Sequence, residues 1–420
     1  MSDLRAAFYG DDFTGSVDAL LQFARAGWRG RLFVGVPTDS ALETAAEESD
    51  VIGIAGIARS LPTAQLEAEV LPALRALASL GPRILQYKAC STADSSPELG
   101  SLGRIVEIGR EVVGPRTVPM LFAQPDFGRY TVFGHHFAAE GGVIHRLDRQ
   151  PTMAQHPSTP MTESDLAVHV SRQTDLPVGS ISHLAYASPE ALAERIDEDA
   201  AAAVVLDALD DRHLALIGAA LALLPGTAFA IGSGGLSTAI GRASGRPGEP
   251  LAVQPIAGGP VLAVSGSRSP RTSAQVAAAA RAGWLVRPLD VDPHAPLDDV
   301  IGALRAGTSV ALTSDEVDPA RRGTAASALA QIATAATAAV GAAVHARATR
   351  RVIVCGGDTS SRVTRMLGVE SLSIAANPWG NVVLCTAHAP GAPIDGAQLL
   401  LKGGQVGDDD LFERVRLLGG

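Results

Sequence analysis

The sequence predicts an α/β protein of two domains, each with a largely parallel sheet flanked by helices. Short apolar runs alternate with longer runs of helical apolar spacing along most of the chain, a pattern typical of a parallel sheet covered by helices. Aromatic residues make up only 4% of the 420 residues, which favours tightly packed helices over an all-β sandwich. Residues 242–258 are rich in Gly and Pro and interrupt the alternation. We therefore expect domains at 1–245 and 258–420, joined by a linker at 246–257.

The first domain opens with a strand, a loop and a helix. RAAFY (5–9) is a short apolar run, GDDFTG is a loop, and SVDALLQFARAG has apolar residues at helical spacing. We expect Ser16 to be the N-cap of this helix and Gly27 to end it. Residues 129–150 depart from the alternation, and their paired glycines predict a β-hairpin. The other expected elements of this domain include strands at 30–36, 50–56, 83–89, 203–208 and 227–233 and a helix at 64–81.

The second domain restarts the alternation. Its expected elements are strands at 260–267, 284–290, 308–314, 350–357 and 399–402, with helices between them and a long Ala-rich helix at 323–344.

Composition and charge exclude several classes of protein. The formal net charge of −10 argues against nucleic-acid binding, which needs a basic surface. Three cysteines, Cys90, Cys355 and Cys385, are widely spaced and form no CxxC motif, so neither a zinc site nor a disulfide framework is indicated. No apolar run approaches the length of a membrane span, and the first residues do not resemble a signal peptide. We expect a soluble protein of the reducing cytoplasm, with no membrane partner.

The stretch YGDDFTGS (9–16) is the first candidate site. Asp11 and Asp12 follow an apolar strand, and open α/β sheets bind ligands at the carboxyl ends of their strands. Two acids there are suited to hold hydroxyl groups, act as a base or bind Mg²⁺ through water. The alternative is a solvated turn in which Asp caps the helix. The motif alone slightly favours this alternative, because Asp and Gly are ordinary turn residues.

Further polar residues follow other strands of the same domain. Arg59 follows one strand, Lys88 ends another, and Ser91, Thr92 and Asp94 lie just beyond it. A pair of cations suits a substrate carboxylate, which Arg can bind in bidentate fashion, and the hydroxyls and acids suit sugar OH groups. Taken singly, each cation could equally be a surface residue.

Three glycine-containing loops follow strands of the second domain. In CGGDTSS the glycines allow close approach of a ligand, and the helix that follows offers unpaired N–H groups to a phosphate. A single loop of this kind is weak evidence, but three along one edge of a sheet favour a nucleotide site over capped turns. The candidate nucleotide-binding residues are Ser265, Gly266, Ser267, Gly356, Gly357, Asp358, Thr359, Lys402, Gly403 and Gly404.

The order of these motifs resembles the four-carbon acid sugar kinases. YGDDFTGSVDALLQFARAG, ARSLP, YKACSTADSS, QPDFGRYTVFGHHF, HPSTPMTESDL, GSGGL, VSGS, CGGDTS and LKGGQVGDDDLF follow one another over nearly the whole chain. The resemblance implies an N-terminal sugar-acid domain, a C-terminal nucleotide domain and an active site in the cleft between them. It implies ATP and Mg²⁺ as cofactors and phosphorylation of a terminal hydroxyl. It assigns Asp11, Asp12 and Arg59 to the sugar acid, and Ser267, Gly356–Thr359 and Gly403–Gly404 to ATP.

One departure from the family pattern bears on the substrate. Many members carry KxDSTLRGN where this chain has KACSTADSSPELG, so that Cys90 replaces an aspartate and Asp94 an arginine. This variant resembles the branch acting on 3-oxo-tetronates and 3-oxo-isoapionate rather than the D-threonate and D-erythronate kinases. Asp12 is the favoured catalytic residue, with Asp11 and Asp94 as rivals.

Other functions remain open at this point. One is a D-threonate or D-erythronate kinase, one is a metal-dependent sugar-acid lyase or aldolase using the two adjacent acids and His136, and one is a sugar-acid sensor without catalysis. No metal ligands are assigned, and a homo-oligomer is compatible with the sequence.

Overall fold

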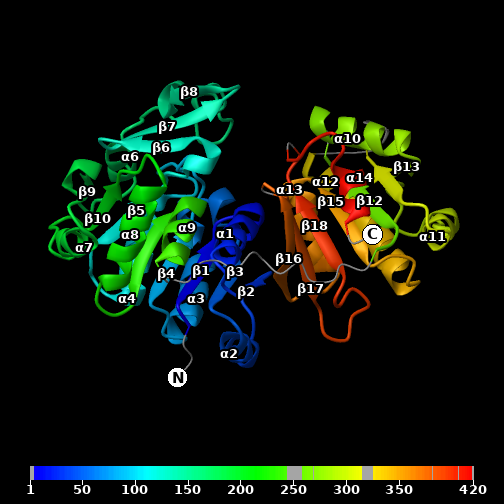
Figure 1. Cartoon of the computed structure of the whole chain (residues 1–420), viewed down its shortest axis with the longest axis horizontal. Helices are drawn as coiled ribbons and strands as arrows, with labels where there is room; N and C mark the ends of the chain where they lie inside the picture. Colours follow the sequence, from blue (N-terminus) through cyan, green and yellow to red (C-terminus); the bar gives the residue numbers. More distant parts are fainter. Residues whose placement is uncertain are drawn as a thin grey trace. The chain divides into compact units, whose positions relative to one another are not determined.

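The computed structural model describes residues 4–243, 258–267, 269–314, 325–380, 382–404 and 406–418. Its contacts divide the chain into two compact units, residues 1–250 and 251–420. Each unit is α/β, with a mainly parallel sheet and helices on both faces (Figure 1), as the sequence predicts. The expected linker at 246–257 lies outside the described residues.

The sheet of unit 1 is parallel throughout, in the order β2-β3-β1-β4-β11-β5-β10-β9. Its strands are β1 Ala6–Gly10, β2 Gly30–Phe33, β3 Val51–Ala55, β4 Ile84–Lys88, β5 Val118–Leu121, β9 Val178–Ile181, β10 Ala203–Leu206 and β11 Ala228–Gly232. The central strands are buried on both faces, which explains why they are continuous apolar runs.

Alternate side chains of β1 point to opposite faces of the sheet. Phe8 stacks on Phe23 of helix α1 with ring centroids 5.9 Å apart, whereas Tyr9 stacks on Tyr87 at 5.7 Å on the other face. Helices α1, α7, α8 and α9 form one layer, and α2, α3, α4 and α6 cover the other face. Their bounds are α1 Phe13–Arg25, α2 Asp39–Glu48, α3 Thr63–Ser79, α4 Leu102–Val113, α6 Leu166–Ser171, α7 Pro189–Asp197, α8 Asp211–Leu223 and α9 Gly234–Arg242.

Helix α1 starts earlier than the sequence indicates. Its N-cap is Asp12 and not Ser16, because the backbone of Asp12 is extended and its Oδ1 accepts a hydrogen bond of 2.7 Å from the amide of Gly15. Ser16 lies inside the helix, where its Oγ donates to the carbonyl of Asp12 at 2.6 Å. The expected loop therefore shrinks to the two aspartates, which join strand and helix directly.

A small antiparallel sheet interrupts unit 1, as the paired glycines predict. It consists of β6 Arg129–Val132, β7 His135–Glu140 and β8 Val143–Arg146, and it is followed by the short helix α5 Pro151–Ala154. Thr131 and Ala208 exchange two backbone hydrogen bonds of 3.0 Å, which tie this sheet to the end of β10.

The sheet of unit 2 has the order β13-β14-β12-β15-β18-β17-β16. The first five strands are parallel, and the β16–β17 hairpin, which the sequence analysis did not predict, adds antiparallel strands beside β18. The strands are β12 Val261–Ser265, β13 Leu285–Pro288, β14 Val310–Thr313, β15 Arg351–Cys355, β16 Ser371–Trp379, β17 Val382–His388 and β18 Gln398–Lys402. The helices are α10 Pro270–Arg281, α11 Asp298–Arg305, α12 Ala325–His345, α13 Gly357–Met366 and α14 Leu411–Leu417.

Helix α12 is the Ala-rich helix of the sequence analysis. By length and composition, its segment Ala328–His345 would suffice to cross a membrane. Half of that segment is buried inside the structure, and the helix packs against α13 and β12. These are properties of a core helix, so the segment is weak evidence for a membrane span.

Candidate functional site

Five neighbouring strands of unit 1 end at the same level. Gly10 pairs with both Ala55 and Lys88, and Gly232 pairs with both Lys88 and Leu121. Residues that directly follow β3, β1, β4, β11 and β5 therefore meet at one edge of the sheet, which is where open α/β sheets bind ligands.

Asp11, Asp12 and Arg59 form a closed ion cluster at this edge. Nη2 of Arg59 lies 2.8 Å from Asp11 Oδ1, its Nε lies 3.2 Å from Asp11 Oδ2, and its Nη1 lies 2.8 Å from Asp12 Oδ2. Burial raises the pKa of Asp11, while the Arg59 guanidinium acts in the opposite direction. The side chain of Asp12 keeps 32% of its surface exposed. The planar guanidinium of Arg59 thus binds the two carboxylates. Of these two acids, Asp12 is the one that a ligand can reach.

Lys88 lies beside this cluster, over the first turn of α1. It is only 3% exposed, and its Nζ donates to the carbonyl of Ala89 at 2.9 Å. A Cβ on Gly15 would lie 2.9 Å from Lys88 Nζ and 2.4 Å from Asp12 Oδ1. Glycine at position 15 is therefore what allows the ammonium and the carboxylate to approach the same point.

Among the other predicted residues of unit 1, Asp94 contacts a neighbouring loop. Asp94 accepts a hydrogen bond from Thr159 and lies 3.8 Å from Nδ1 of His156. Thr92 Oγ1 lies 3.1 Å from the sulfur of Cys90. Ser91 lies between Cys90 and Thr92, with intermediate exposure. The structure therefore pairs Asp94 with the loop at 156–159, an association that sequence spacing did not reveal.

His136 is fully buried. Its Nδ1 lies 2.9 Å from Oγ1 of Thr131, and burial lowers the pKa of His136 to about 3. Burial likewise lowers the pKa of His169 to about 4. In the described parts of the chain, no three His, Cys, Asp or Glu side chains are grouped so as to hold a metal ion.

The three glycine-containing loops of unit 2 lie together, as expected. Ser265, Cys355 and Lys402, which end β12, β15 and β18, are in register with one another. A Cβ on Gly266 would lie 2.3 Å from Oγ1 of Thr359, and one on Gly404 would lie 2.6 Å from Oγ of Ser267. The loops approach so closely that a side chain at either glycine would separate them.

Helix α13 begins inside this group of loops. Gly356 is its N-cap and has φ +108°, a backbone conformation that favours glycine, and among the described side chains none caps the helix there. The first N–H groups of α13 therefore lie beside the loops, an arrangement that is suited to hold an anion. The side chain of Asp358 lies outside the described atoms.

Lys402 brings a buried positive charge to the same place. It is 2% exposed, its Nζ donates to Oγ1 of Thr272 at 3.1 Å, and burial lowers the pKa of Lys402. Across the described residues, no carboxylate lies within 4.0 Å of it. Thr272 in turn donates to the carbonyl of Gly404 at 2.9 Å. A buried ammonium without a carboxylate partner is stabilised when an anion such as phosphate binds beside it.

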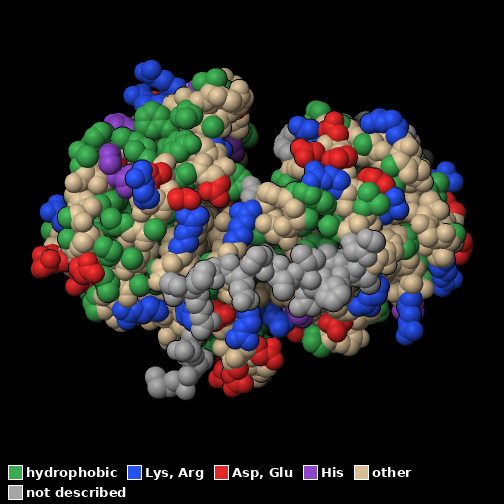
Figure 2. Space-filling model, in the orientation of Figure 1, with side chains coloured by type: hydrophobic (Ala, Val, Ile, Leu, Met, Phe, Trp, Pro, Cys, Tyr) green, Lys and Arg blue, Asp and Glu red, His purple; other side chains and the backbone are tan. Residues whose placement is uncertain are grey.

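Lys88 and Lys402 are the only lysines among the 34 Lys and Arg residues of the chain. Both are buried, and each is the last residue of a strand in its own sheet, β4 and β18. On the face shown in Figure 2, basic side chains are scattered among acidic ones and form no continuous stripe. The chain thus uses arginine for exposed positive charge and lysine only at the two candidate sites, where a compact ammonium differs from a planar fork.

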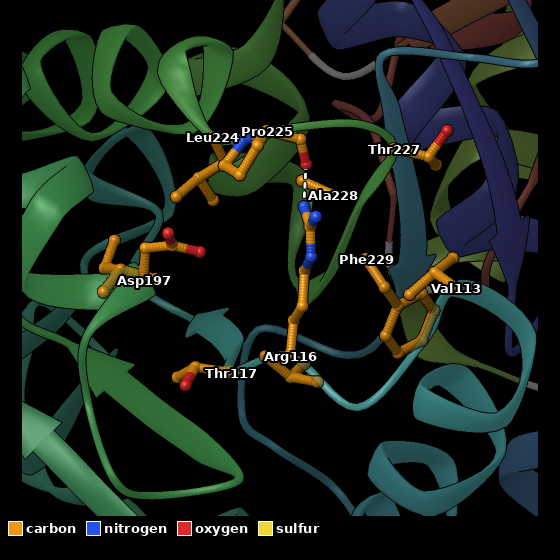
Figure 3. A pocket seen from close by; sticks show the side chains of 11 residues that line it. Val113, Arg116, Thr117, Asp197, Leu224, Pro225, Thr227, Ala228 and Phe229 are labelled. Atoms are coloured by element: carbon orange, nitrogen blue, oxygen red, sulfur yellow. Dashed lines mark hydrogen bonds between the residues drawn. The ribbon is translucent and has the colours of Figure 1, made fainter.

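A further pocket of unit 1 lies away from these sites. Figure 3 shows it between Thr117, just before β5, and Thr227 and Ala228, at the start of β11. Arg116 donates to the carbonyl of Pro225 in its wall. This is the amino end of the sheet, opposite the edge that carries Asp12, and it contains none of the predicted site residues.

Comparisons with known proteins assign both units. Residues 6–240 match a sugar-binding N-terminal domain, and residues 262–412 match a nucleotide-binding C-terminal domain. The chain belongs to the sugar-acid kinase family built from these two domains. A 3-oxo-isoapionate kinase of Paraburkholderia graminis is 38% identical over 449 residues, covering 98% of this chain and 94% of that one. A 3-oxo-tetronate kinase of Pseudomonas fluorescens is 31% identical over 430 residues, covering 98% and 96%.

A solved structure supports the fold of this kinase family member. A protein of Salmonella typhimurium LT2 superposes with a TM-score of 0.82 at 26% identity, over 99% of each chain. The family assignment supports a phosphotransferase that acts on an alcohol group, and the relatives offer no support for a lyase.

The predicted set leaves out two polar side chains of this kinase that follow β5 at the same edge of the sheet as Asp12. Gln124 and Arg129 flank the turn Pro125–Gly128 that follows β5. The sequence signal that could have found them is the polar QPDFGR stretch directly after an apolar strand.

Proposed function

We propose that this kinase transfers the γ-phosphoryl group of ATP to the terminal hydroxyl of a 3-oxo sugar acid, either a 3-oxo-tetronate or 3-oxo-isoapionate. The observation that carries the proposal is Lys402, a buried ammonium without a carboxylate partner in the described residues, placed where three glycine loops and a helix N-terminus converge. That combination provides positive charge and backbone N–H groups for a polyphosphate.

On the nucleotide side, the chain would bind phosphates through the loops at Ser265–Ser267, Gly356–Thr359 and Gly403–Gly404. Phosphoryl transfer asks the protein mainly to position the phosphate and to neutralise its charge. Mg²⁺, when bound with the nucleotide, would neutralise phosphate charge further, and carboxylates and phosphates are the ligands it prefers. Lys402 would contact the phosphates as a point charge.

On the acceptor side, Asp12 would orient the hydroxyl and accept its proton. Its carboxylate is the exposed member of the ion cluster and is fixed by the Gly15 amide and the Arg59 guanidinium. The buried Asp11 would hold Arg59 in place rather than meet the substrate. Lys88, next to Gly15, would offset the negative charge that gathers at the hydroxyl.

The choice of substrate rests on the relatives and on Cys90. The 38% identical relative is a 3-oxo-isoapionate kinase, and the 31% identical relative of Pseudomonas fluorescens is a 3-oxo-tetronate kinase. Cys90 and Asp94 stand where D-threonate and D-erythronate kinases carry other residues, so these acids are the second choice. With three free cysteines, we place the kinase in the reducing cytoplasm.

The test is ADP release, coupled to NADH oxidation, over a panel of four- and five-carbon sugar acids and their 3-oxo forms. We expect a 3-oxo acid to give the highest kcat/KM and D-threonate to be poorer. Omission of the acid provides the ATP hydrolysis blank. ADP release that no sugar acid increases would refute the proposal, and a preference for D-threonate would move the enzyme to the other branch.

A further inference from the structure

Two buried hydrogen-bond donors lack an acceptor at the edge of the unit 1 sheet that carries Asp12. Within the described residues, Nε2 of Gln124 and Nε of Arg129 have no hydrogen-bond partner. Gln124 is 3% exposed. Buried donors are almost always paired, because leaving them unpaired costs free energy. Two unpaired donors in one place therefore indicate that an acceptor outside the polypeptide binds there.

The two donors are held side by side. The backbone N–H of Gln124 donates to the backbone carbonyl of Arg129 at 2.9 Å, and the backbone N–H of Arg129 donates to the backbone carbonyl of Gln124 at 3.1 Å. Residues that exchange both bonds across an antiparallel pair project their side chains on the same face. The guanidinium is fixed at its other end, because Nη1 donates to the carbonyls of Phe127 and Ala139, each at 3.0 Å. Burial lowers the pKa of Arg129, so an anion would stabilise this poorly solvated cation.

Gln124 also faces the start of helix α9. A Cβ on Gly234, the first residue of α9, would lie 2.8 Å from Nε2 of Gln124 and 2.4 Å from Oδ2 of Asp18. The other oxygen of Asp18 accepts a hydrogen bond of 2.8 Å from Gln22. Glycine at 234 leaves a recess between an amide, a carboxylate and the positive end of a helix dipole. Asp18 lies on α1, the helix that Asp12 caps.

We propose that Gln124 and Arg129 bind the carboxylate of the sugar acid, with the N-terminus of α9 facing the same group and Asp18 accepting from a substrate hydroxyl. This inference rests on the proposed function and names its carboxylate subsite. Arg59, the residue expected from the sequence for this role, donates to Asp11 and Asp12 instead. Selectivity for an acid over a neutral sugar then comes from the turn after β5.

The experiment compares the best sugar acid of the ADP-release panel with its carboxamide, which keeps the shape and removes the charge. The variants are Arg129→Gln and Gln124→Leu, with Asp126→Asn, an exposed change in the same turn, as the matched control. The wild type should prefer the acid. Each variant should lose about 10- to 100-fold in kcat/KM for the acid, the effect of losing one charge-assisted hydrogen bond, with little change for the carboxamide.

A third variant, Arg59→Lys, should lower the rate with acid and carboxamide alike, because its contacts are with Asp11 and Asp12. If Arg129→Gln does not fold, Gln124→Glu serves in its place, since it keeps the volume and sets a negative charge against the carboxylate. Equal losses for acid and carboxamide, or no loss, in the Gln124 and Arg129 variants would overturn the subsite. A wild type that phosphorylates no sugar acid would instead refute the proposed function.

Discussion

Replacing Lys402 by Met should weaken nucleotide binding without weakening the fold. The ammonium is buried, donates to Oγ1 of Thr272 at 3.1 Å and has a pKa lowered by burial. Its charge therefore costs free energy in the unliganded protein and is offset only when an anion binds. Met preserves the length of the side chain and removes the charge. The melting temperature without nucleotide should stay unchanged or rise, because the variant no longer carries a buried charge. Each 1 kcal/mol of stability gained is worth about 2–4 °C in a unit of this size.

The loss of affinity can be estimated from the contact that disappears. A hydrogen bond to a charged group is worth about 1.5–3 kcal/mol, so Kd for ATP should rise about 10- to 150-fold. At an ATP concentration 100 times the wild-type Kd, ligand binding stabilises the folded state by about 2.7 kcal/mol. A 30-fold weaker variant would retain about 0.9 kcal/mol by the same relation. The ATP-induced shift in melting temperature should then fall from about 8 °C to about 3 °C.

Calorimetric titration with ATP and Mg²⁺, together with thermal melts, measures both quantities. Lys88→Met is the matched control, because it removes the other buried lysine from the sugar-binding unit and should leave Kd for ATP unchanged. Unaltered ATP affinity in Lys402→Met would remove this residue from the nucleotide site. A large drop in melting temperature without nucleotide would show that the charge is structural.

Two further predictions concern unit 1. Asp12→Asn keeps a good N-cap for α1 but cannot accept a proton, so kcat should fall about 100-fold or more while ATP affinity is retained; near-native kcat would leave Asp12 with capping alone. The pKa of His136 is lowered to about 3 and that of His169 to about 4, against an ordinary value of about 6.5. Between pH 6.5 and 4 these histidines are therefore protonated in the unfolded chain but stay neutral in the folded one. The free energy of unfolding should fall as pH falls, by up to about 1.4 kcal/mol per pH unit for each histidine. Urea titrations at several pH values measure this slope, which His169→Gln should reduce by the contribution of one histidine. An unchanged slope in that variant would contradict the lowered pKa of His169.

The periodicity of apolar residues was sufficient to predict the order of most helices and strands, because the strands of both sheets are buried on two faces and are therefore apolar runs. The predicted N-cap of α1 was wrong by four residues, because the extended backbone of Asp12 makes this residue, and not Ser16, the cap. The antiparallel hairpin β16–β17 was missed although Asn377-Pro378 and Gly380 are turn signals between its two apolar runs. The domain boundaries and the roles of the site residues stay predictions.

Long-range partners were beyond sequence reasoning. Strand ends could be placed on one edge, but the closure of Arg59 onto both aspartates depends on the short helical turn Ala58–Ser60 that carries it. The pairing of Asp94 with Thr159 joins residues 65 positions apart. Gln124 and Arg129 became neighbours only through the backbone bonds that close their turn.

The scarcity of lysine has a practical consequence for chemical probes. Apart from the amino terminus, the chain has two primary amines, and neither Lys88 nor Lys402 exposes more than 3% of its surface. Amine coupling of the native enzyme to a sensor surface should therefore attach it through the amino terminus and spare both ligand sites. An aldehyde-bearing ATP analogue that reaches Lys402 should yield a single labelled position. A protease that cuts after lysine does not cut after a modified one, so a missed cut at Lys88 or Lys402 in the denatured chain shows in one mass spectrum which site was labelled.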